Sequence, residues 1–129
     1  MKVNLSFRKD SVQKNHHPVV IKFVRFLQSK LPIEETLDIF ITSEKEGKMT
    51  TGGRHDDSTI FVLGGKRLIR DILRTLAHEW VHEYQMTILK REKGPNIGGI
   101  NEDEANAIAG KLIKLFEVEY PYVLETMYE

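Results

Sequence analysis

The chain has 129 residues, of which 19 are basic and 19 acidic, so its formal net charge is zero. This length fits a single domain over residues 1–129, and the 40% hydrophobic content excludes a disordered chain. The balanced charge argues against a nucleic-acid partner, and the lack of cysteine excludes disulfides and thiolate metal sites. No apolar run is long enough for a membrane span or a signal peptide, so we expect no membrane contact and a cytoplasmic location.

Strand and helix patterns alternate through the first half of the chain. Residues 3–7 alternate apolar and polar side chains, which predicts a short strand, and Pro18 can open a helix over residues 19–30. Residues 37–42 and 58–63 are rich in strand formers. We therefore expect an α+β domain with a short, mostly antiparallel sheet.

Two long helices are predicted in the second half. Residues 66–91 carry a buried stripe that ends in Trp80 and Tyr84, and His78 and His82 fall on the opposite side. After a glycine-rich loop, residues 101–119 form a second helix, with an apolar stripe of Ala105, Ile108, Ala109, Leu112 and Phe116. Such neighbours pack antiparallel, which brings the start of the second helix back toward the histidines.

The segment His78-Glu79-Trp80-Val81-His82 has the pattern H-E-x-x-H within the first of these helices. Residues four apart lie one turn apart on the same face, so the two imidazoles can share one metal ion. Glu79 lies about 100° round the helix, where a general base for a metal-bound water is needed. The pattern predicts a Zn²⁺ site with one further protein ligand and an open position for water.

The candidates for the third ligand are the acidic residues at the start of the second helix, Glu102, Asp103 and Glu104. Glu102 and Glu104 lie about 200° apart on that helix, so only one can face the metal, and we favour Glu104. The alternative is structural, because Asn101 as the N-cap and Glu104 three residues later would also form a capping box.

The histidine motif, followed by Glu104-Ala105-Asn106, resembles small gluzincin-type zinc peptidases, and is similar to the ImmA/IrrE-like and SprT-like phage or bacterial proteins. The resemblance covers about residues 52–116, with Ile108 in place of the usual aromatic residue. It implies a minimal zincin-like fold, Glu104 as the third zinc ligand, and a strand at residues 59–63 whose edge binds extended peptide. That strand could equally be an ordinary central one.

We expect a zinc metallopeptidase that hydrolyses peptide bonds, with Glu79 as the base for the zinc-bound water and a protein or peptide as substrate. Gln85 lies on the histidine face and could hydrogen-bond a ligand, while Arg54 or His55 could stabilise an oxyanion or simply be solvated turn residues. The alternatives are a non-catalytic zinc-binding regulatory module of the same fold and a DNA-associated SprT-like protease. Intact Glu79 argues against the first and zero net charge against the second.

Overall fold

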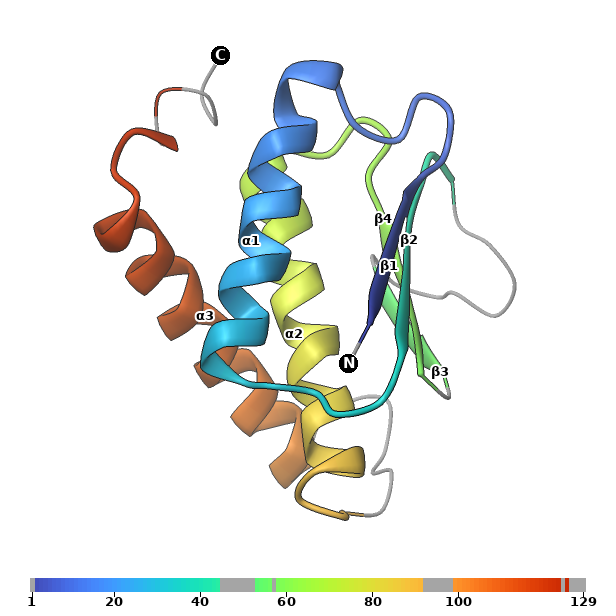
Figure 1. The fold of residues 1–129 in the computed structure, drawn as a ribbon, viewed down its shortest axis with the longest axis vertical. Helices are drawn as coiled ribbons and strands as arrows, with labels where there is room; N and C mark the ends of the chain where they lie inside the picture. The colour runs from blue at the N-terminus through green and yellow to red at the C-terminus, as the bar shows by residue number, and fades with distance from the viewer. Residues whose placement is uncertain (1, 45–52, 57, 92–98, 124, 126–129) are drawn as a thin grey trace.

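The computed structural model describes residues 2–44, 53–56, 58–91, 99–123 and 125, without the side chains of residues 54–56. It is an α+β domain in which helices α1 and α2 lie on one face of a four-stranded sheet and α3 packs outside them (Figure 1). The elements in chain order are β1 (Val3–Phe7), η1 (Lys14–His16), α1 (His17–Lys30), β2 (Leu37–Thr42), β3 (Gly53–Asp56), β4 (Thr59–Leu63), α2 (Ile69–Thr87) and α3 (Ile100–Glu119).

The sheet has the strand order β1-β2-β4-β3, and β1, β2 and β4 run parallel. The expected mostly antiparallel sheet is therefore wrong, and β3 pairs antiparallel with β4 at the edge. The physical reason lies in the connection between β1 and β2, which contains α1. A helical crossover returns the chain to the same end of the sheet, so the next strand runs parallel.

The core lies between the sheet and the helices. In β2 and β4 the alternating residues Leu37, Ile39, Ile41, Ile60 and Val62 are fully buried, because successive side chains on a strand point to opposite faces. One face of α1 completes this core, since four residues at helical spacing are buried: Val20, Phe23, Val24 and Leu27.

The two long helices exist as predicted, but both differ at their ends. α2 begins at Ile69 rather than residue 66, because Leu68 has extended dihedral angles (φ −65°, ψ 145°) and Gly65 has a positive φ of 51°. α3 begins at Ile100, after Gly99 at φ 89°, a left-handed value that glycine tolerates without steric cost. The start of α3 decides which of its acidic residues faces the histidines of α2.

α2 is the helix that joins the layers. Its Trp80 side chain is fully buried, and its indole Nε1 donates a 2.9 Å hydrogen bond to the Leu31 carbonyl at the end of α1. This contact fixes the rotation of α2, so the histidine face turns toward α3 and β3. Within the described part of the chain, no helix is long and apolar enough to cross a membrane.

Candidate metal centre

The two histidines of α2 meet as the motif predicts. Their Nε2 atoms lie 3.1 Å apart, and the rings stand nearly perpendicular at 88°. One helical turn separates them, so the imidazoles project from a single face of α2 toward α3. The expectation that His78 and His82 could present nitrogen atoms to one point is confirmed.

The third residue of the cluster is Glu102, from the first turn of α3. Its Oε1 lies 3.0 Å from His78 Nε2, and its Oε2 lies 2.8 Å from His82 Nε2. These three residues form a possible metal-binding triad, with donor atoms that all lie within 4.8 Å of one another. The structure thus brings Glu102, and not Glu104, to the histidines, and the choice of Glu104 is corrected.

Glu104 is held on another side of α3. Its Oε1 accepts hydrogen bonds from Gln85 Nε2 at 3.0 Å and from Arg91 Nη1 at 2.7 Å. These two hydrogen bonds lower the pKa of the Glu104 carboxyl. The capping-box alternative is also wrong, because the N-cap of α3 is Gly99 and no side chain caps the helix. Since α3 starts earlier than predicted, Glu104 lies beyond the third helical position that a capping box uses.

Small residues on α3 explain why Glu102 reaches the histidines. Ala105 and Ala109 are almost completely buried, and they allow the backbones of α2 and α3 to approach closely. Glu102 precedes them by three and seven residues, so it shares their face of the helix. Glu104 lies about 200° away from Glu102 and cannot share that face.

The donor set fits a divalent cation. The two Nε2 atoms lie 3.1 Å apart, and they face different oxygens of the Glu102 carboxylate at 3.0 and 2.8 Å, so a cation between them would be attracted by all three groups. Donors at about 2.1 Å from a tetrahedral zinc ion would stand about 3.4 Å apart, close to the observed separations. Imidazole nitrogens with one carboxylate oxygen suit zinc and other first-row transition metals.

The electrostatics of His78 favour its metal-binding form. Burial lowers the pKa of His78, the Glu102 carboxylate opposes this shift, and the neighbouring His82 adds to it. This shift favours the neutral imidazole, which is the form in which histidine binds a metal. His78 also makes a side-chain hydrogen bond with Asn106, which lies one turn after Glu102 on α3. Sequence reasoning did not single out Asn106, although its spacing of four from Glu102 places it on the same face.

Glu79 lies beside the triad and outside it. It is buried, and its Oε1 is 4.0 Å from His78 Nε2. Strand β3 passes directly over it, because a methyl group on Gly53 would lie 3.1 Å from Glu79 Cγ and 3.3 Å from Glu79 Oε1. The carboxylate thus lies beside the histidines and next to the edge of the sheet; the place beside the histidines agrees with its position about 100° round the helix from His78.

The peptide-binding strand expected at residues 59–63 is not an edge strand. This segment forms β4, which lies between β2 and β3, so the alternative of a central strand is confirmed. The edge next to Glu79 is β3, which the sequence patterns did not reveal. Arg54 and His55 lie in strand β3 rather than in a turn. Their side chains are outside the described part of the structure, so the roles predicted for them stay predictions.

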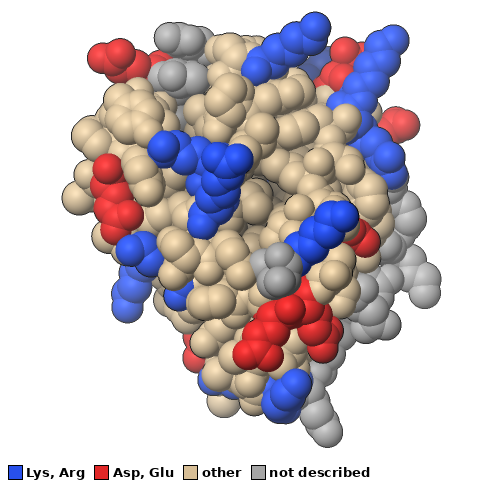
Figure 2. All heavy atoms as spheres, in the orientation of Figure 1, with Lys and Arg blue, Asp and Glu red and all other residues tan. Residues whose placement is uncertain are grey.

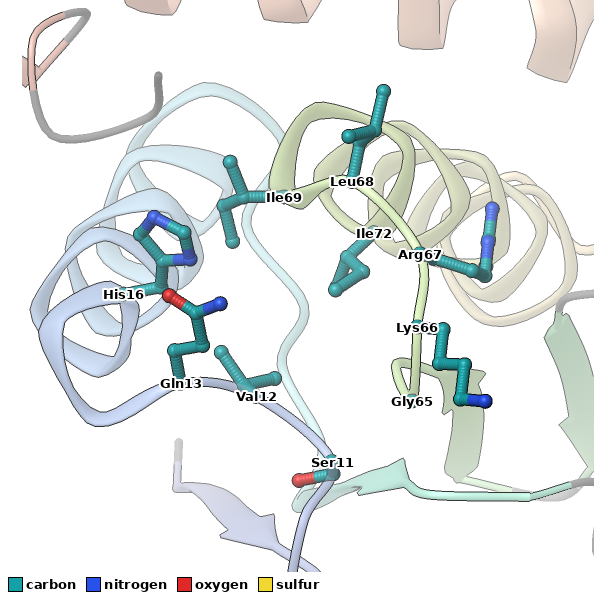
Figure 3. Close-up of a pocket in the computed structure, with 10 residues that line it drawn as sticks. All are labelled: Ser11, Val12, Gln13, His16, Gly65, Lys66, Arg67, Leu68, Ile69 and Ile72. Carbon is teal, nitrogen blue, oxygen red and sulfur yellow. The ribbon is translucent and has the colours of Figure 1, made fainter. Parts of the chain in front are cut away.

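A separate cavity of about 330 Å³ lies at the beginning of α2. It opens between Val12 and Gln13 of the loop after β1, with His16 of η1, and Ile69 and Ile72 of α2 on the opposite side (Figure 3). None of the three donor residues lines this cavity. It is therefore distinct from the candidate metal centre.

The sequence matches no protein-family model, no curated protein and no solved structure.

Proposed function

We propose that this protein is a zinc-dependent metallopeptidase with a minimal zincin-like domain. The observation that carries the proposal is a buried carboxylate, Glu79, which is 4.0 Å from His78 and stands beside a complete His78–His82–Glu102 triad. The resemblance to gluzincin-type peptidases supports the two histidines and Glu79. Its third ligand would be Glu102 rather than Glu104.

The roles follow from the positions of the side chains. His78, His82 and Glu102 would hold the metal. Zinc, when bound, would polarise the scissile carbonyl and lower the pKa of a coordinated water to about 7. Glu79 would take the proton of the attacking water on a carboxylate oxygen and pass it to the leaving amine nitrogen. The resulting products would be a carboxylate and an amine, so no further reactant is required.

Strand β3 supports a peptide as the substrate. In the strand order β1-β2-β4-β3 it is the last strand, and its Gly53 lies against Glu79. An extended peptide that adds to this edge would make backbone hydrogen bonds and bring its carbonyl groups past the carboxylate. Recognition of this kind needs little side-chain specificity, so we propose an unfolded or flexible protein segment as the substrate class.

The surface charge favours a peptidase without a nucleic-acid partner. On the face shown in Figure 2, basic and acidic side chains of the described residues are interspersed, and the whole sequence is neutral. A DNA-associated protease would be expected to carry a continuous basic surface. The non-catalytic alternative is disfavoured because the triad is complete without Glu79, so a purely structural site would not need that residue.

The proposal is tested by separating metal binding from catalysis. Wild-type protein should bind one zinc ion per chain, and His78→Ala should lose it. Glu79→Gln should keep the zinc and lose cleavage of a denatured protein mixture, while Asp103→Asn, at an exposed position on α3, should keep both properties. Equal cleavage by wild type and Glu79→Gln would refute the catalytic role, and failure of the wild type to bind zinc would refute the metal centre.

A further inference from the structure

Gln85 is an almost completely buried amide directly behind His82. It is 1% exposed, and its Oε1 lies 2.9 Å from His82 Nδ1, the ring nitrogen that faces away from the triad. The hydrogen bond predicted from the helical position of Gln85 is thus present. Its consequence for His82 depends on which end of the amide faces the ring.

The orientation of the Gln85 amide is fixed by its other partners. Its Nε2 donates to the Asn101 carbonyl oxygen at 3.0 Å and to Glu104 Oε1 at 3.0 Å. Both partners only accept hydrogen bonds, so the nitrogen must face them and the oxygen must face His82. A flipped amide would place its oxygen against two other oxygens and lose both hydrogen bonds.

This orientation decides where the proton of the imidazole lies. The amide oxygen has no hydrogen to donate, so His82 Nδ1 must be the donor. A neutral imidazole with its proton on Nδ1 has a free lone pair on Nε2. That nitrogen is the one that faces Glu102 Oε2 at 2.8 Å and His78 Nε2 at 3.1 Å.

A salt bridge holds the amide in place. Arg91 Nη1 contacts Glu104 Oε1 at 2.7 Å, and the Arg91 backbone N–H donates to the Gln85 carbonyl oxygen at 2.9 Å. A chain of contacts therefore runs from Arg91 through Glu104 and Gln85 to His82. It gives Glu104 a definite role, although this residue is not one of the three donors.

We propose that Gln85 is a positioning residue that presets His82 with its proton on Nδ1 and its Nε2 ready for a cation, and that Glu104 and Arg91 lock the amide in this orientation. The part of the proposal that concerns zinc affinity rests on the proposed function. The part that concerns the tautomer does not, because it follows from protein contacts alone.

The tautomer is measured by NMR of the imidazole nitrogens in the metal-free protein, at a pH about two units above the usual imidazole pKa of about 6.5. The Glu102→Ala background is used, because the Glu102 carboxylate lies 2.8 Å from His82 Nε2 and would favour a proton on that nitrogen by accepting its hydrogen bond. In this background His82 should carry its proton on Nδ1. Adding Gln85→Met should shift the population toward the Nε2–H tautomer, while adding Gln28→Met, a remote amide on α1, should leave it unchanged.

Zinc affinity is measured by competition with a chelator in proteins that retain Glu102. Gln85→Met should weaken zinc binding by about 10–100-fold, the usual cost of losing such a contact. In the exchanged pair, Gln85→Glu with Glu104→Gln, one carboxylate oxygen again accepts from His82 Nδ1 and the other accepts from the amide introduced at position 104, while the Asn101 carbonyl oxygen loses its donor. This pair should bind zinc more tightly than Gln85→Met, which a role in packing alone would not explain.

Each outcome bears on the proposal. An Nε2–H tautomer in the Glu102→Ala protein, or the same tautomer with and without Gln85, would overturn it. Equal zinc affinity of the wild type and Gln85→Met would overturn the link to metal binding. If the wild type binds no zinc while the tautomer responds to Gln85, the proposed function fails and the positioning role of Gln85 stands.

Discussion

Replacing Gly53 by alanine should disturb the contact between β3 and the catalytic face of α2. The added methyl group would lie 2.5 Å from Thr75 Cγ2 and 3.1 Å from Glu79 Cγ. Thr75 cannot easily turn away, because its Oγ1 accepts a 2.7 Å hydrogen bond from Arg67. The strand or the Glu79 side chain must therefore shift, and overpacking of this kind costs about 1–3 kcal/mol.

The effect is measured as the change in the free energy of unfolding in urea, alongside zinc affinity and peptide cleavage. We expect lower stability and slower cleavage with unchanged zinc affinity, because the three donor atoms lie on α2 and α3 and not on β3. Gly110→Ala on α3 is the matched control. A methyl group there meets no atom within 4 Å, and alanine should stabilise the helix by about 0.5–1 kcal/mol.

A second substitution tests the stated cause. Thr75→Ser removes the methyl group that would clash and keeps the hydroxyl that Arg67 contacts. In the double variant, Gly53→Ala with Thr75→Ser, much of the lost stability should return as a favourable interaction energy between two residues in contact. Strictly additive effects, or a Gly53→Ala variant as stable and active as the wild type, would refute the reasoning.

Three further predictions concern the triad, the second carboxylate and the core. Glu102→Gln should weaken zinc binding by at least about 100-fold, which exceeds the usual loss for a residue outside the ligand set. Glu104→Gln should weaken it by about 10–100-fold at most. The reverse order in chelator competition would restore Glu104 as the ligand. The lowered pKa of Glu104 means that its ionised carboxylate stabilises the folded state; this contribution is complete above the usual pKa of 4.5 and is lost as the pH falls through the lower folded value. The difference in unfolding free energy between wild type and Glu104→Gln, measured in urea, should therefore shrink on acidification. A constant difference would contradict this. Trp80→Phe leaves the Leu31 carbonyl without its indole donor and should cost about 1–3 kcal/mol by circular dichroism in urea, against little change for the exposed Leu68→Ala.

The sequence predicts those parts of the fold that depend on local periodicity. The faces of α1 and α2 follow from residues three and four apart, and the meeting of His78 with His82 needs nothing more than one helical turn. The antiparallel sheet was wrongly predicted because strand direction depends on how a connection packs, and spacing does not reveal that. β3 was missed because Gly53 and Asp56 are poor strand formers, and only pairing with β4 makes this segment a strand.

The choice between Glu102 and Glu104 failed for a different reason. Each residue turns an α-helix by about 100°, so which acidic residue faces the two histidines depends on where α3 begins and how it is rotated. Gly99, with its positive φ, sets that beginning, and Ala105 sets the closest approach of the two helices. Both effects arise from the packing of α3 against α2, and local periodicity does not encode that packing.

The three donor residues all belong to one helical hairpin, whereas the strand that would align a peptide belongs to the sheet. α2 is joined to that sheet through a short segment after β4 that contains Gly65 in a left-handed conformation. A small displacement of the hairpin relative to the sheet would change the distance between Glu79 and β3 without changing the distances among the donors. Affinity for the metal and speed of turnover are therefore separate mechanical properties of this fold, and selection could adjust one while it leaves the other intact.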